Sequence, residues 1–400
     1  MGSKNVRMVF ALALVSSSIA CTRSQHTEGE YLIGDKLEAV ALASRDGSSQ
    51  SKVAMFDQVT RRIHVFKTSS LEHERAYEVT RPEAQHFVLQ PKDGRYVVDL
   101  STKNLSVYDG EGKPSHDLLH LAGSPVSAAY RPEAGWIVVY DSMMTVGVVK
   151  ITDEGKVSAA WTGGSLVQPG SSIVAGDILP SGKLALSLSD DSVALVDLTA
   201  SIAQLKWQLE KFASPVGRIT WLAPVPNTSL ALVKTETKIA LLDLAARTLV
   251  AERPLGSGEV VKLVKSGDPH VLLRTGRELA LVYVKDGLLR ESANFPEVAG
   301  IVSSRLNLEL DHWTLIESSQ EITRIDDDVN AQKRSRTLKR YRFSDMAGYQ
   351  NMALPPDAEL EVTNDFVFAL YPSKLGYAKK IRIQDETVEE LKLFNLPYIQ

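Results

Sequence analysis

Cysteine is almost absent from this chain, which has one in 400 residues. A single cysteine excludes a disulfide framework and any metal site built from several cysteines. A basic excess is also missing, because 45 lysines and arginines stand against 49 aspartates and glutamates, giving a net charge of −4. Proteins whose main partner is nucleic acid usually carry a strong positive excess. We therefore expect no nucleic-acid partner.

Catalytic signatures are missing as well. The chain contains no His-Glu-x-x-His zinc motif, no Gly-x-Ser-x-Gly nucleophile motif and no Gly-x-x-x-x-Gly-Lys phosphate-binding loop. We expect no metal and no cofactor. A catalytic site assembled from several loops would leave no such motif, so the sequence does not decide whether the protein is an enzyme, although it favours a non-enzyme.

The first twenty residues have the pattern of an export signal. Lys4 and Arg7 precede the apolar run from Met8 to Val15, and small residues follow up to Ala20. This is the order of a basic region, an apolar region and a cleavage site. The run is shorter than the roughly 20 residues that a transmembrane helix needs. We therefore predict a signal peptide over residues 1–20, whose removal leaves 43 basic and 49 acidic residues, a net charge of −6.

Cys21 directly follows the predicted cleavage site. The order Ile19-Ala20-Cys21 resembles the lipobox of bacterial lipoproteins, although Ser18 stands where leucine is usual. The resemblance implies that Cys21 becomes the N-terminus and is acylated, for example with palmitate, and that residues 21–35 form a tether. Thr22 in place of aspartate then implies the outer membrane, facing the periplasm, rather than the inner membrane. The alternative is an ordinary secretory cut after Ala20.

The rest of the chain repeats a short apolar strand that ends in aspartate, as in Val193-Ala194-Leu195-Val196-Asp197. Successive aspartates lie 44, 44, 46, 43, 59 and 40 residues apart, and a weaker copy lies 41 residues before the first. A second apolar run precedes each copy, and a turn and another strand follow it. The marker aspartates are Asp109, Asp153, Asp197, Asp243, Asp286, Asp345 and Asp385.

A period of roughly 40–45 residues is the length of one four-stranded propeller blade. The eight copies predict an all-β, eight-bladed β-propeller of antiparallel blades over residues 36–395, and helical periodicity is nearly absent. Seven blades is the alternative. We interpret the marker aspartates as turn formers, because an aspartate side chain can bond backbone N–H groups that follow it. The tryptophans are expected to pack within the blades; they are Trp136, Trp161, Trp207, Trp221 and Trp313.

The interval between Asp286 and Asp345 is about 15 residues longer than its neighbours. It contains three consecutive aspartates, at 326–328, and then a basic cluster, so we predict an inserted loop near residues 326–340. The simpler interpretation is a solvated loop whose charges pair with one another. The alternative is a binding site for an acidic partner or for anionic lipid headgroups, because positive charge is concentrated in an acidic chain. The candidate partner-binding residues are Lys333, Arg334, Arg336, Lys339 and Arg340.

The repeats resemble those of WD-type and pyrroloquinoline-quinone-type propellers. The strand that ends at Asp197, with Trp207 after it, is most similar to the quinone type, although Ala200-Ser201 and Ala246-Arg247 stand where that repeat has Thr-Gly. Cofactor and calcium ligands of the quinone enzymes have no counterparts that we can place. In size, anchor and repeat, the chain also resembles the propeller lipoprotein of the outer-membrane β-barrel assembly machinery.

These resemblances imply a non-enzymatic envelope lipoprotein that acts as a protein-binding scaffold, with a role in outer-membrane protein assembly. Its expected partners are envelope proteins and, through the lipid anchor, the membrane. It is expected to be a monomer or one subunit of a hetero-complex. The alternative is a periplasmic propeller enzyme, hydrolase or lactonase-like, with its site at the central channel.

Overall fold

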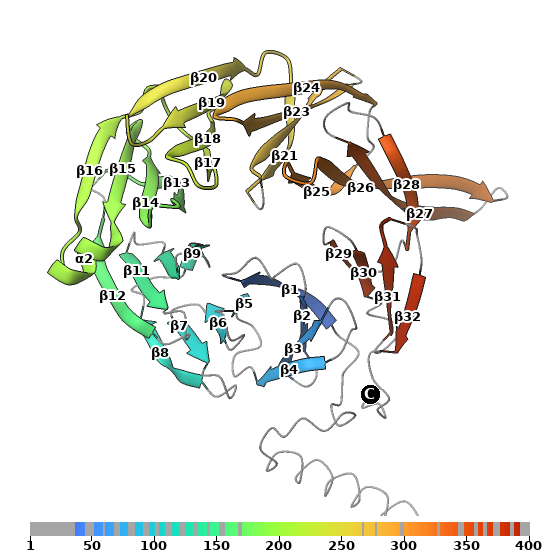
Figure 1. Cartoon of the computed structure of the whole chain (residues 1–400), viewed down its shortest axis with the longest axis horizontal. Helices are drawn as coiled ribbons and strands as arrows, with labels where there is room; N and C mark the ends of the chain where they lie inside the picture. The colour runs from blue at the N-terminus through green and yellow to red at the C-terminus, as the bar shows by residue number, and fades with distance from the viewer. Residues whose placement is uncertain are drawn as a thin grey trace, which may run out of the picture.

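The computed structural model is a ring of β-sheet blades around a central opening (Figure 1). Apart from short gaps, it describes residues 157–292 and 300–325, and elsewhere the strands with a few flanking residues. Side chains are described for most of residues 170–292, 303–318 and 335–342, and for a few residues of other strands. The predicted signal peptide, Cys21 and the tether lie outside the described residues, so these stay predictions.

The described strands form six four-stranded sheets and one eight-stranded sheet, which is two blades joined edge to edge. Each blade is antiparallel, and its strands run in chain order from the centre of the ring outward (Figure 1). This confirms the eight-bladed propeller. Blade 1 consists of β1 (Leu37–Ser44), β2 (Lys52–Asp57), β3 (Arg62–Lys67) and β4 (His73–Glu78), and blade 2 of β5 (Gln85–Gln90), β6 (Tyr96–Leu100), β7 (Asn104–Tyr108) and β8 (Pro114–His120). Blade 3 consists of β9 (Pro125–Arg131), β10 (Trp136–Asp141), β11 (Thr145–Ile151) and β12 (Val157–Ser165), and blade 4 of β13 (Ile173–Ile178), β14 (Lys183–Leu188), β15 (Ser192–Asp197) and β16 (Leu209–Ala213). Blade 5 consists of β17 (Trp221–Pro224), β18 (Leu230–Lys234), β19 (Lys238–Asp243) and β20 (Thr248–Pro254), and blade 6 of β21 (Glu259–Val264), β22 (His270–Thr275), β23 (Glu278–Lys285) and β24 (Leu288–Pro296). Blade 7 consists of β25 (Ile301–Asn307), β26 (His312–Ile325), β27 (Val329–Arg342) and β28 (Gly348–Leu354), and blade 8 of β29 (Glu359–Val362), β30 (Phe366–Leu370), β31 (Tyr377–Arg382) and β32 (Val388–Lys392).

The first strand helps to close the ring. Residues 37–40 of β1 pair with β2, whereas residues 41–44 pair in parallel with residues 87–90 of β5. The same strand contacts β29, so the first and last blades meet. Each repeated apolar strand of the sequence is the third strand of a blade, and the apolar run that precedes it is the second strand.

The hydrophobic core lies between blades, as β19 illustrates. Ile239 and Leu241 pack against blade 6, whereas Ala240 and Leu242 pack against blade 4. All four side chains are at most 1% exposed. A strand buried on both faces is an unbroken apolar run rather than an alternating one. The repeat is therefore visible in the sequence as runs of consecutive hydrophobic residues.

Tryptophans belong to these interfaces between blades. Trp136 lies in the cluster that joins blades 3 and 4, Trp221 in that of blades 5 and 6, and Trp313 in that of blades 6 and 7. The rings of Trp161 and Trp207 are half-buried, with their centroids 4.4 Å apart. The Trp207 indole also donates to the Gly164 carbonyl at 2.9 Å. The described tryptophans thus pack, as expected.

A short helix, α2 (Leu198–Gln204), connects β15 to β16 and was not expected from the sequence. Asp197 caps its N-terminus, because its carboxylate accepts from the Ala200 N–H at 2.9 Å. Leu205 ends it with a left-handed φ of 50°. Seven residues are too few to show a helical period. In the part of the chain that the structure describes, no helix has the length and apolar character needed to cross a membrane.

Three marker aspartates have described surroundings; Asp243 and Asp286 form turns, whereas Asp197 caps a helix. Asp197 is the helix cap, and Asp243 accepts from the N–H groups of Ala245 and Ala246 at 2.9 and 3.0 Å. The Ala246 N–H is the main cause of the lowered pKa of Asp243. Asp286 and Gly287 have φ values of 53° and 71°, as a two-residue hairpin turn of type I′ requires. The other markers lie outside the described residues, namely Asp109, Asp153, Asp345 and Asp385.

Candidate interaction surface

Blade 7 carries a hairpin that is longer than the blade itself. β26 and β27 have 14 residues each and pair continuously from His312↔Arg342 to Ile325↔Val329. However, β25 pairs with β26 only as far as Glu317, and β28 pairs with β27 only from Arg336 on. Residues 319–325 and 329–335 therefore form a two-stranded extension, which we call the blade 7 ribbon. Figure 1 shows it projecting outward from the ring.

The ribbon corrects the expectation of an inserted loop near residues 326–340. Most of these residues belong to β27, and the extra length of the interval is divided between two strands of one hairpin. The physical reason is that a two-stranded ribbon outside a blade has no buried face. The sequence indicates a strand over residues 321–325, but residues 329–335 show no apolar alternation that marks them as a strand.

The root of the hairpin is fixed by burial. Trp313 and Tyr341 lie directly opposite each other, and their rings stack with centroids 5.0 Å apart. Trp313 is 0% exposed and Tyr341 8%, and burial raises the pKa of Tyr341 to about 12. Ile316 and Leu338 pack against blade 8 on the other face. The ribbon therefore projects from a rigid base.

The five predicted partner-binding residues do not share one environment. The Lys339 ammonium lies 2.7 Å from the Glu317 carboxylate, and Arg340 is 6% exposed, so both belong to the blade rather than to an exposed site. Arg336 is half-buried at the root of the ribbon. Lys333 and Arg334 lie on the ribbon, and their side chains are outside the described residues. The basic cluster is visible in the sequence, but only the strand register shows which of its residues belong to the blade and which to the ribbon.

The register also distributes charge between the two faces of the ribbon. On one face, Lys333 lies opposite Glu321, an arrangement of opposite charges that stabilises antiparallel strands. The other face contains two arginines and no acidic residue, and Arg336 continues it at the root, opposite Ser318. We call it the arginine face; its cross-strand pairs are Gln320↔Arg334, Ile322↔Gln332 and Arg324↔Asn330.

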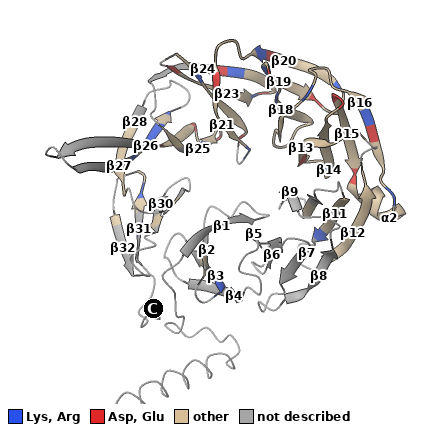
Figure 2. Cartoon of the chain, turned by 180° about the vertical axis from the view of Figure 1, so that it is seen from behind, with Lys and Arg blue, Asp and Glu red and all other residues tan. Residues whose placement is uncertain are grey.

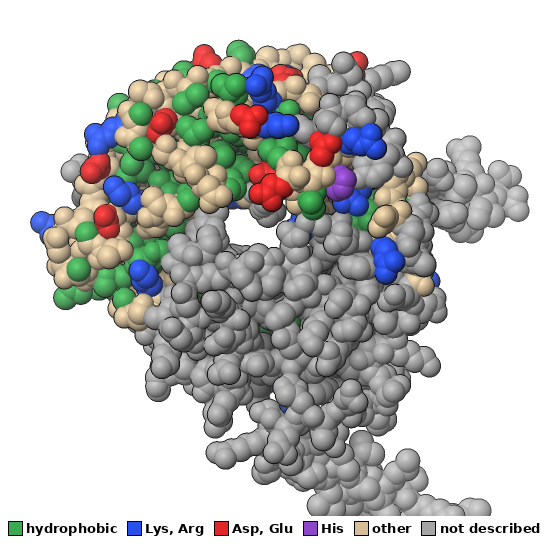
Figure 3. Space-filling model, viewed as in Figure 1, with side chains coloured by type: hydrophobic (Ala, Val, Ile, Leu, Met, Phe, Trp, Pro, Cys, Tyr) green, Lys and Arg blue, Asp and Glu red, His purple; other side chains and the backbone are tan. Residues whose placement is uncertain are grey.

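The surface of the described blades is different, because its charges are interspersed and paired. Arg253 of β20 binds both carboxylate oxygens of Glu291 of β24 at 2.8 Å, and Arg247 pairs with Glu210 of β16. Figure 2 shows basic and acidic residues together along these outer strands. In the view of Figure 3, acidic, basic and hydrophobic side chains alternate over the described blades. Exposed pairs of this kind contribute about 1 kcal/mol or less each.

A buried polar network joins blades 6 and 7. The His270 ring approaches the Asp268 carbonyl at 2.9 Å through Nδ1 and the Ser304 hydroxyl at 2.7 Å through Nε2. The Trp313 indole donates to the same hydroxyl at 3.0 Å. A carbonyl can only accept, so Nδ1 carries the proton and Ser304 donates to Nε2. Burial lowers the pKa of His270 to about 4, which keeps the ring neutral.

This network contains a serine and a histidine, so we asked whether it could form the catalytic site of the alternative, a hydrolase. Ser304 and His270 have the composition of a nucleophile and its base, but they are only 7% and 0% exposed. The carboxylate of Asp268 does not orient the histidine; it accepts from the Leu308 N–H at 2.8 Å. A substrate therefore has no access to Ser304. The pair is a structural connection between two blades.

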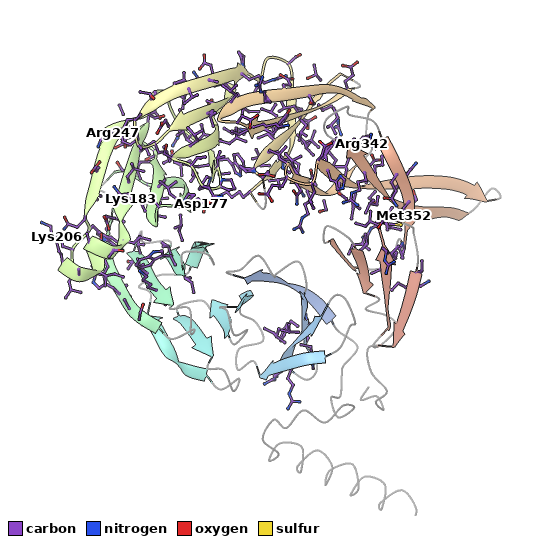
Figure 4. All side chains as sticks on the ribbon, in the orientation of Figure 1. Asp177, Lys183, Lys206, Arg247, Arg342 and Met352 are labelled. Atoms are coloured by element: carbon purple, nitrogen blue, oxygen red, sulfur yellow. The ribbon has the colours of Figure 1, made fainter. Side chains whose placement is uncertain are left out.

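Charged groups also meet at the inner rim of the ring. The Lys265 ammonium, just after β21, lies 3.4 Å from the Asp177 carboxylate of β13 and 3.3 Å from the Gly176 carbonyl. This contact reaches from blade 6 to blade 4, and Figure 4 labels Asp177 beside the central opening. Among the described residues, no three His, Cys, Asp or Glu side chains gather closely enough to hold a metal ion.

Comparisons with known proteins agree with the fold. No protein family model matches the chain, and no curated protein sequence matches it. Among solved structures, it is similar to the dihydro-heme d1 dehydrogenase NirN in complex with DHE, with a TM-score of 0.52 at 11% identity over 92% of this chain and 75% of that one. It is also similar to the WD40 domain of SCAP from fission yeast, with a TM-score of 0.52 at 12% identity over 89% of this chain and 97% of that domain. At such identities the similarity shows the propeller fold alone.

Proposed function

We propose that this protein is a non-enzymatic scaffold of the bacterial envelope that binds other proteins. The fold supports a scaffold, because a closed ring of blades is a rigid frame that presents loops and edges to partners. The observation that carries the proposal is the blade 7 ribbon. It projects beyond the sheets of its own blade and lies apart from the described interfaces that hold the ring together.

The place of action is proposed from the sequence. The signal-like residues 1–20 and Cys21 support export and a lipid anchor, and each buried acyl methylene contributes about 0.8 kcal/mol to membrane binding. An anchored ring on the periplasmic face of the outer membrane would act as one subunit of a hetero-complex. The resemblance to the propeller lipoprotein of the β-barrel assembly machinery supports a role in outer-membrane protein assembly.

Removal of the ribbon tests the proposal. The Ser318 N–H bonds to Gly300 of β25, so the next pair, Ser319 and Ser335, faces across the ribbon, and an Asn-Gly turn can join these two residues in place of residues 320–334. The shortened full chain should keep its melting temperature, because the interfaces of blade 7 remain. It should lose the proteins that co-purify with the wild-type chain from detergent-solubilised envelopes, measured by quantitative mass spectrometry.

A matched control is Asp243→Asn, which alters a turn in blade 5 and leaves the ribbon intact. This variant should retain the wild-type partners. Identical sets of partners for the wild-type and shortened chains would exclude the ribbon as the binding element. Turnover of ester or lactone substrates by the purified chain would favour the alternative of a propeller enzyme.

A further inference from the structure

The blade 7 ribbon is an open piece of β-sheet. Among the strands that the structure describes, none pairs with residues 329–335 on the side away from β26, because β28 ends its pairing at Leu354↔Arg336. An unpaired strand edge presents a row of N–H and C=O groups that another strand can bind. The ribbon thus offers a site for strand pairing outside the ring.

The charge of this edge restricts what can pair with it. Proteins protect exposed edges with proline, with short strands or with charged residues. The ribbon residues of β27 include no proline, and their charges are the basic Lys333 and Arg334, followed by Arg336 at the root. Like charges oppose the pairing of two copies of this ribbon, whereas opposite charges favour an acidic strand.

We propose that the ribbon edge of β27 binds an extended acidic segment of a partner protein by β-strand addition. This inference rests on the proposed scaffold function and specifies its partner. In strand addition, backbone hydrogen bonds give affinity and alternate side chains give specificity. Arg334 and Arg336 are two residues apart, hence roughly 7 Å along the strand on the arginine face. Because Leu354 of β28 already pairs with Arg336, the open edge begins beyond it, and a partner strand there would present Asp or Glu to Arg334 at the positions that share the arginine face.

The geometry favours a protein strand over anionic lipid headgroups. Headgroups respond to the amount of positive charge and need no strand register. On this ribbon, Lys333 shares its face with Glu321, whereas both ribbon arginines share the other face without an acidic residue. The ribbon thus has basic residues on one face and an open strand edge. A partner strand, whose side chains alternate between two faces, can use both features at once, whereas a lipid headgroup cannot.

The test uses the full chain in a neutral detergent and three fluorescent peptides of equal length. One alternates Asp with Val, one replaces the valines with Pro, and one alternates Lys with Val. Proline removes the N–H donors, so the second peptide keeps the charge and loses the ability to pair as a strand. Fluorescence anisotropy should show that the Asp-Val peptide binds at least about tenfold more tightly than the other two, a difference of about 1.4 kcal/mol.

Two charge-reversed variants form a matched pair. Arg334→Glu changes the arginine face, and Lys333→Glu makes the same change in net charge on the other face. Arg334→Glu should reverse the preference from the Asp-Val to the Lys-Val peptide, whereas Lys333→Glu should preserve it. Equal effects of the two variants, or equal binding of the Asp-Val and Asp-Pro peptides, would show charge attraction without strand pairing and would overturn the proposal.

Two further outcomes separate this inference from the proposed function and from lipid binding. If the chain without the ribbon loses its envelope partners while no peptide binds the wild-type chain, the scaffold function stands and strand addition fails. If the partners do not depend on the ribbon, the proposed binding element fails regardless of the peptides. Soluble short-chain phosphatidylglycerol serves as the lipid probe; if Arg334→Glu weakens its binding but not that of the Asp-Val peptide, lipid is the ligand and the proposal falls.

Discussion

Arg247 adopts a backbone conformation that normally favours glycine. Its φ is 60°, in the turn between β19 and β20, where quinone-type repeats have the glycine of Thr-Gly. The left-handed conformation costs a non-glycine residue roughly 1–2 kcal/mol. The arginine, labelled in Figure 4, pairs with Glu210 of the neighbouring blade, and its Cζ lies 5.6 Å from the centroid of the Phe212 ring of the same blade. Contacts with the neighbouring blade offset the strain of this conformation, so the turn forms although arginine stands in place of glycine.

Substitutions at Arg247 should separate strain from contacts. Arg247→Ala loses the contacts and keeps the strain, whereas Arg247→Gly loses the contacts and relieves the strain. The glycine variant should therefore be more stable than the alanine variant by about 1 kcal/mol in urea unfolding. At Lys206, where φ is not left-handed, the same two substitutions should rank in the opposite order. An alanine variant at 247 as stable as the glycine variant would show that the turn is not strained.

At the scale of elements, the sequence predicted the repeated strands and missed two features. Strands such as β15 and β19 were recognisable because both faces are buried, which leaves consecutive apolar residues. Helix α2 escaped detection because it is short and lacks a period. The basic cluster could be recognised from its composition. Which of its residues lie in the blade and which in the ribbon depends on strand register, and composition does not predict register.

The contact between blades 6 and 7 makes stability depend on pH. His270 has a pKa of about 4 in the folded protein, below its ordinary value of 6.5, so the unfolded chain binds more protons between these values. The free energy of unfolding should be unaffected by this group above pH 6.5 and should fall as the pH drops toward 4, by up to about 3 kcal/mol.

The variant His270→Gln should remove this dependence. It should be less stable than the wild-type chain at pH 7.5 by about 1–3 kcal/mol, because a buried partner is lost. Its unfolding free energy should then change less between pH 6.5 and 4, measured by urea unfolding at each pH. A lowered pKa at His312 acts in the same direction, so some slope should remain. An unchanged slope would mean that His270 does not titrate on unfolding.

At the scale of the whole molecule, a ring that is stable through its interfaces carries a ribbon with an open strand edge. Continuous apolar clusters join blade 3 to blade 4 and each following blade to the next, as far as blade 8. Amide hydrogens in such strands exchange only when the structure opens, whereas groups at an unpaired edge exchange with water directly. The two parts should therefore differ in exchange by orders of magnitude.

Hydrogen–deuterium exchange of the full chain, alone and with the Asp-Val peptide, tests this separation most directly. In the free chain, we expect slow exchange in the second and third strands of the blades and fast exchange at residues 330, 332 and 334, whose N–H groups point away from β26. The peptide should slow exchange at these residues and leave the blades unchanged. Slow exchange at these residues in the free chain, or peptide protection in the blades instead of the ribbon, would contradict the account.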